Sequence, residues 1–187
     1  MPKILTRIAQ WSAALLGGIA LSACSKVVSF VEEVEIEGKT YRVERKEYFK
    51  RMPIEMNWTF VFLESEIYVK DLGLPRWRSD LSPMYLGLNK DREYVLVGLI
   101  TNAAARAKRT SLSSSYVGFK VVKDQWIEIP VPLEFDGRKA TFLMATNAEK
   151  GEKALLTAKE RDFRNSVQGV GRVGAIDSTL VNPTKGN

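Results

Sequence analysis

Cys24 has the most distinctive chemistry in this sequence, because it is the only cysteine among 187 residues. A lone cysteine has no partner for an internal disulfide, and a free thiol is rare in an oxidising compartment. Histidine is absent, which removes the commonest general base near neutral pH and the commonest metal ligand. We therefore expect no zinc or copper site, no metal and no cofactor, and we take Cys24 as the candidate for covalent modification.

The residues before Cys24 have the three parts of an export signal. Lys3 and Arg7 give a positive start without an acidic residue, an apolar run follows over 8–23, and small residues precede the cysteine. A membrane-spanning helix needs about 20 apolar residues, so this run is short for a permanent span. Gly17 and Gly18 would also weaken such a helix. The pattern predicts a helical signal peptide over residues 1–23.

The four residues Leu21, Ser22, Ala23 and Cys24 resemble the lipobox of bacterial lipoproteins position by position. This resemblance implies that the Cys24 thiol carries a diacylglycerol, that the chain is cut before Cys24, and that the new amino group is acylated. Ser25 at the next position implies delivery to the outer membrane, with the domain facing the periplasm. The alternative is an ordinary secretory signal with an incidental or buried structural cysteine.

Composition predicts one domain after the signal. Residues 1–23 carry two basic and no acidic residues, so their removal lowers the net charge from +6 to +4 and leaves 164 residues. That length can bury a sizeable core. A modest positive charge suits contact with anionic lipid, glycan or polymer, but at +4 a mixed solvated surface is the interpretation we favour. We expect a lipidated tether over 24–33, a β-rich domain over 34–166 and a flexible tail over 167–187.

Alternating apolar and polar residues predict short antiparallel strands joined by hairpin turns. The expected pairs are 33–37 with 41–43, 84–88 with 94–100, and 116–122 with 126–129, with a further strand at 58–69 and a connector at 74–84. The run 95–100 is apolar on both faces, which is typical of a central strand. Pro130 and Pro132 indicate an edge strand. The fold class is therefore mainly β, as a compact antiparallel sandwich or small barrel.

Three further elements follow from local signals. Asn102 is expected to begin a helical turn, and Asp136-Gly137 to form a turn that leads into a strand over 140–144. Asn147 can cap one C-terminal helix that ends near residue 165, with a narrow apolar stripe of Leu155, Leu156 and Phe163.

The segments 32–49, 77–98 and 126–130 also resemble small proteobacterial lipoproteins of unknown function, which share an EGKTY-like turn and a later tryptophan strand. This resemblance implies no activity.

Catalytic patterns are weak. Residues 169–174 fit the letters of the dinucleotide fingerprint GxGxxG, but a helix rather than a strand is predicted before them, and only 13 residues follow. The serines at 111 and 113–115 have no histidine or lysine motif to activate them. Glu64 with Glu66, or Glu33 with Glu35, would have to face a cleft to cleave glycans, whereas alternating acids usually form the solvated face of a strand.

Two basic clusters are the candidate binding residues: Arg76, Trp77 and Arg78, and then Arg106, Lys108 and Arg109. Tryptophan can stack on sugars, and arginine binds phosphate or carboxylate groups through paired hydrogen bonds. The alternative is that Trp77 fills the core and the arginines only solubilise its surroundings.

We expect a non-enzymatic binding or structural lipoprotein that contacts an envelope protein or glycan and no nucleic acid. An immunity or inhibitor lipoprotein and a carboxylate-dependent glycan hydrolase are the alternatives.

Overall fold

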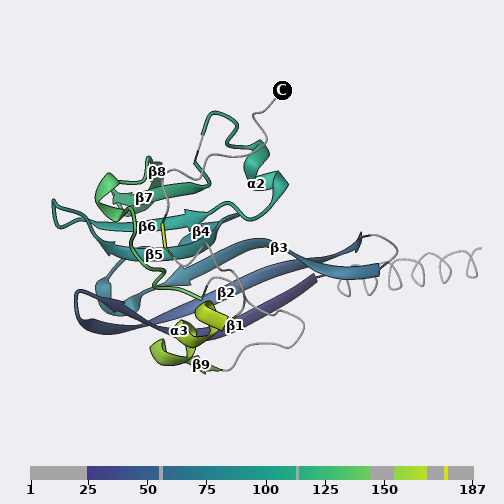
Figure 1. The fold of residues 1–187 in the computed structure, drawn as a ribbon, viewed down its shortest axis with the longest axis horizontal. Helices are drawn as coiled ribbons and strands as arrows, with labels where there is room; N and C mark the ends of the chain where they lie inside the picture. The colour runs from purple at the N-terminus through teal and green to yellow at the C-terminus, as the bar shows by residue number, and fades with distance from the viewer. Residues whose placement is uncertain (1–24, 55–56, 113, 144–153, 168–174, 177–187) are drawn as a thin grey trace, which may run out of the picture.

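The described part of the molecule is a β-sandwich. The computed structural model describes residues 25–54, 57–112, 114–143, 154–167 and 175–176. Two sheets pack against each other and do not close into a barrel (Figure 1). The predicted mainly β architecture with one C-terminal helix is therefore confirmed. The predicted signal peptide and the lipobox-like residues Leu21 to Cys24 lie outside the described residues.

The first sheet has the strand order β4-β3-β2-β1-β9. The strands are β1 (Ser25–Ile36), β2 (Lys39–Ile54), β3 (Asn57–Tyr68), β4 (Trp77–Ser79) and β9 (Leu155–Leu156). Neighbours are antiparallel except for β9, which runs parallel to β1. Glu37 and Gly38, both at positive φ, turn the chain from β1 to β2.

The second sheet has the order β5-β6-β7-β8, and every pair is antiparallel. Its strands are β5 (Ser82–Leu88), β6 (Tyr94–Leu99), β7 (Tyr116–Val122) and β8 (Gln125–Ile129). The predicted hairpins are confirmed, β6 is central as expected, and β8 is an edge strand before Pro130. The short helix α2 (Ala103–Ala107) begins after Asn102, as predicted, and the Asn102 side chain accepts a hydrogen bond from the Ala105 amide.

The main core lies between the two sheets. Val34, Val43 and Trp77 from the first sheet meet Leu96 and Phe119 from the second. A second cluster covers the opposite face of β6, where Val95 and Val97 pack with Phe135, from the 3-10 helix η2 (Leu133–Phe135), and with Ile176. Both faces of β6 are therefore buried, which explains its continuous apolar run.

Three sequence-based boundaries were wrong. Residues 25–33, expected to form a tether, are the first part of β1, because they pair along their length with residues 42–50 of β2. Residues 74–84, expected to form a connector, include β4 and the start of β5. Ile176, expected in a frayed tail, is buried and its amide donates to the Arg138 carbonyl.

The expected strand at 140–144 does not form over its described residues, 140–143. The amides of Thr141 and Phe142 both donate to the carbonyl of Met84, and the Thr141 hydroxyl accepts from the Leu86 amide. The amide and carbonyl of Leu143 bond to side chains of the first sheet. The backbone polar groups of this segment therefore bond to side chains and to the single carbonyl of Met84. They do not form the regular hydrogen bonds between neighbouring strands.

The C-terminal helix, α3 (Ala158–Val167), begins later than predicted. Leu155 and Leu156 belong to β9 and pair with Val31 and Glu32 of β1. Leu156 is buried, but Phe163 is exposed, so the predicted apolar stripe does not form. Hydrogen bonds from polar side chains, in place of an apolar stripe, hold α3 against the rest of the domain. The proposed cap Asn147 lies outside the described residues. The described helices include none that is both long and apolar enough to cross a membrane.

Candidate functional site

The first basic cluster is divided between two faces of a sheet. Trp77 begins β4, and its side chain is 1% exposed in the main core, where it packs edge-on against Phe119 with ring centroids 5.4 Å apart. Arg76 and Arg78 lie on the outer face. Alternation along a strand separates neighbouring side chains in this way. The proposed joint arginine–tryptophan surface is therefore wrong, and the simpler alternative holds for Trp77.

Arg76 and Arg78 form ion pairs with the acids that had suggested a hydrolase. Arg76 donates to Glu66 at 3.0 Å, and Arg78 bonds to Glu64. Each guanidinium also lies over a tyrosine ring, Arg76 at 4.4 Å from Tyr68 and Arg78 at 4.9 Å from Tyr48. These contacts form a ladder of opposite charges on the outer face of the first sheet.

The second basic cluster lies at the end of α2 and contacts both neighbouring loops and strand β8. Arg109 is only 10% exposed in its side chain, and it donates to Asp80 at 2.9 Å and to Glu128. Lys108 also reaches Asp80, at 2.9 Å. Arg106 donates to the carbonyl of Ser114 at 2.9 Å and to the hydroxyl of Ser115. Each of these three cations already has an intramolecular partner.

We predict that Asp80→Asn lowers stability by up to about 1 kcal/mol at neutral pH, because it removes ion pairs with Lys108 and Arg109. Partial burial would raise the pKa of Asp80, but the hydrogen bonds and charges of Lys108 and Arg109 outweigh it and lower the pKa. The stabilisation is therefore complete above the pKa of an unfolded aspartate and is lost as pH falls through the folded value.

Urea denaturation of the wild type and Asp80→Asn at several pH values checks this. Their difference in unfolding free energy should shrink in acid, whereas exposed Asp71→Asn should match the wild type throughout. A difference for Asp80→Asn that did not change with pH would contradict the assignment.

A buried charge cluster, which the sequence analysis missed, lies on the inner face of the first sheet. Arg45 is 1% exposed and donates through Nη1 to Glu32 at 2.9 Å and to the Leu143 carbonyl at 2.9 Å, while Nη2 bonds to Glu47. The Leu143 amide donates to the other oxygen of Glu32. Burial raises the pKa of Glu32, although Arg45 and the Leu143 amide oppose this. The cluster ties residue 143 to β1 and β2.

The alternation of β1 and β2 carried a signal for this cluster. Val28, Phe30, Val34 and Ile36 are buried on the inner face of β1, and Glu32 occupies the same register. On β2, Arg45 and Glu47 likewise fall between buried Val43 and Phe49. A charged residue at an inward position predicts a buried ion pair, because an isolated buried charge is costly.

A cavity of about 750 Å³ lies between the end of β1, β5, α3 and the segment 138–141. Arg161 of α3 forms part of its wall, and its Nη1 donates to the carbonyls of Glu33 at 2.6 Å and Thr141 at 2.7 Å. Arg161 also bonds to Asp162 at 2.8 Å. Asn165 donates to the Phe142 carbonyl at 3.0 Å. These polar bonds hold α3 in place and give the cavity a fixed wall.

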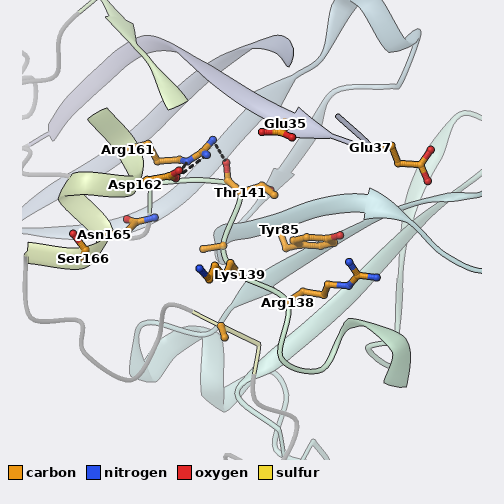
Figure 2. A pocket seen from close by; sticks show the side chains of 12 residues that line it. Glu35, Glu37, Tyr85, Arg138, Lys139, Thr141, Arg161, Asp162, Asn165 and Ser166 are labelled. Atoms are coloured by element: carbon orange, nitrogen blue, oxygen red, sulfur yellow. Dashed lines mark hydrogen bonds and ion pairs between the residues drawn. The ribbon is translucent and has the colours of Figure 1, made fainter. Parts of the chain in front are cut away.

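The cavity has an acidic side and a basic side. Figure 2 shows Tyr85 between the carboxylates of Glu35 and Glu37 and the side chain of Arg138, with Lys139 from the same segment. Glu37 is paired with Arg92 at 2.9 Å. Within the described part of the chain, neither Arg138 nor Lys139 is in an ion pair. Burial raises the pKa of Tyr85, so its phenol stays protonated and can donate a hydrogen bond.

The cavity residues were not predicted as a site, apart from Glu35, which was considered only as half of a carboxylate pair. Among the described residues, no group of three or more acidic, histidine or cysteine side chains is arranged to hold a metal ion. Comparison of the chain with protein-family models, curated proteins and solved structures gives no match.

Proposed function

We propose that this protein is a lipid-anchored binding protein of the bacterial envelope, and that the cavity beside α3 holds its ligand. The lipobox-like residues Leu21 to Cys24 support the anchor, outer-membrane delivery and a periplasmic domain. The observation that carries the binding function is the cavity of about 750 Å³ with Arg138 and Lys139 on one side and Glu35 on another. In contrast, the two predicted basic clusters use their cations in intramolecular contacts.

The side chains around the cavity suit a small ligand with both carboxylate and amino groups. Arg138 can hold a carboxylate through paired hydrogen bonds, and Lys139 adds a second positive charge. Glu35 can accept a hydrogen bond from a ligand amine, and the phenol of Tyr85 supplies a neutral donor beside an apolar ring. Peptides of the bacterial cell-wall polymer carry this combination of groups, which makes a peptide-bearing glycan our preferred ligand class.

We predict that joint replacement of Arg138 and Lys139 by alanine weakens binding of soluble cell-wall muropeptides about tenfold or more, because a hydrogen bond to a charged group contributes about 1.5–3 kcal/mol. Calorimetric titration of the purified full-length protein measures this. Lys70→Ala with Lys90→Ala removes the same charge at exposed positions that do not line the cavity and should leave binding unchanged.

Equal affinity in wild type and the Arg138/Lys139 variant, or no binding by the wild type, would contradict the cavity assignment. Recovery of one stoichiometric protein, instead of glycan, from cross-linked envelopes would favour the immunity or inhibitor alternative.

A further inference from the structure

The β2–β3 hairpin projects past the beginning of β1. Ser25, the first residue of β1, pairs with Lys50 of β2. Beyond that pair, β2 and β3 continue to pair with each other from Arg51 with Phe60 to Ile54 with Asn57. At about 3.4 Å per residue, the hairpin reaches about 14 Å further than Ser25. Figure 1 shows this end of β2 and β3 extending away from the sheet formed by β5–β8.

Large apolar side chains are exposed on this projecting end. Trp58 is 60% exposed, Ile54 is 46% exposed and Met52 is 40% exposed. Val27, beside the start of β1, is also exposed. Three such side chains at the end of one hairpin, with Val27 on the neighbouring strand β1, differ from single apolar residues scattered over a surface, and they mark a contact site.

Basic groups accompany these apolar side chains. The guanidinium of Arg51 lies 5.4 Å from the centre of the Trp58 ring, and the ammonium of Lys26 lies 5.8 Å from the centre of the Phe60 ring. Lys50 is exposed on the other face of β2. Within 49–63 the sequence has one acid, Glu55, which lies outside the described residues. Tryptophan with nearby lysine and arginine is the composition that proteins place at the boundary between lipid headgroups and acyl chains.

The position of Cys24 indicates that the partner of this surface is a membrane. Cys24 is bonded directly to Ser25, and Ser25 is paired with Lys50 at the base of the projecting hairpin. We infer that the hairpin end, consisting of Lys50–Ile54 and Asn57–Phe60, inserts into the headgroup region of the membrane that holds the acyl chains of Cys24. Its basic groups would contact anionic phospholipid headgroups. This inference rests on the lipid anchor of the proposed function.

Membrane contact at this end also fixes where the cavity faces. Glu35 lies ten residues after Ser25 on β1, which corresponds to about 34 Å along the strand. The hairpin and the anchor occupy one end of β1, and the cavity lies near the other. The domain therefore holds its cavity away from the lipid, where it can reach a polymer in the surrounding compartment.

Tryptophan quenching tests the insertion. The mature acylated protein, which begins at Cys24 and therefore lacks Trp11, is reconstituted in vesicles of phosphatidylcholine and phosphatidylglycerol with brominated acyl chains, which quench tryptophan only near the lipid. We expect quenching of the wild type, loss of most of that quenching in Trp58→Phe, and unchanged quenching in Trp126→Phe, since Trp126 lies in β8 of the other sheet. Trp58 is exposed, so its replacement should leave the fold intact.

Flotation and mass measurement of the same sample separate the two proposals. Vesicle-bound protein with acylated Cys24 but equal quenching in wild type and Trp58→Phe would overturn the hairpin inference and leave the anchor standing. A mature protein without acyl chains on Cys24 would overturn the anchor, and with it the reason to place this hairpin on a membrane.

Discussion

Replacing Arg45 by methionine is expected to lower the free energy of unfolding by about 3–5 kcal/mol, because it breaks the buried ion pairs that Arg45 forms with Glu32 and Glu47. The change also removes the hydrogen bond to the Leu143 carbonyl. Urea denaturation of the full chain, followed by circular dichroism, measures the effect. Arg42→Met, on the exposed face of the same strand, is the matched control and should change stability by less than about 0.5 kcal/mol.

Two further variants keep this prediction testable if Arg45→Met does not fold. Arg45→Lys retains the charge but not the paired hydrogen bonds, so its loss should be smaller. Adding Glu32→Gln and Glu47→Gln to Arg45→Met also removes the two buried carboxylate charges and should recover part of the stability. A loss below about 1 kcal/mol for Arg45→Met would contradict the role of this cluster, since a broken buried pair costs several times more.

Replacing Cys24 by alanine is expected to abolish incorporation of radioactive palmitate and to move the protein from the membrane fraction to the soluble fraction. Each buried methylene of an acyl chain contributes about 0.8 kcal/mol to membrane binding, so several chains form a stable anchor. The exposed hairpin end alone offers far less apolar surface. Ser22→Thr is a useful control, because it leaves the thiol in place. Persistent labelling of Cys24→Ala would contradict lipidation at this residue.

Local sequence patterns predicted the antiparallel hairpins well. Strict alternation, as in β1 and β2, defines which face of a strand is buried, and the apolar run of β6 indicated its central position. Asn102 supplied a local capping signal for α2. These features depend on residues that are close in the chain, so no knowledge of the tertiary structure was needed.

Long-range contacts account for the errors. Segment 141–143 forms no strand, because Leu143 bonds to Glu32 and Arg45, which are 111 and 98 residues away in the sequence. Leu155 and Leu156 leave the predicted helix because they pair with β1. No local pattern contains these partners, and the cavity was missed because it forms where these distant segments meet.

The basic clusters show the same limit at the level of side chains. Their composition suggested a ligand surface, but Arg78 pairs with Glu64 and Arg109 with Glu128, from strands that only the fold brings alongside. Arg138 and Lys139 gave no comparable signal as an isolated pair of basic residues. The positions of the acidic residues decide which cations remain available for a ligand. Those positions follow from the pairing of the strands.

Mass spectrometry of the N-terminal peptide of the protein purified from membranes tests the central claim most directly. The lipid-anchored account predicts a mature chain that begins at Cys24 and carries a diacylglycerol on the thiol and an acyl chain on the amino group. A mature chain that begins at another residue, or an unmodified Cys24, would contradict it.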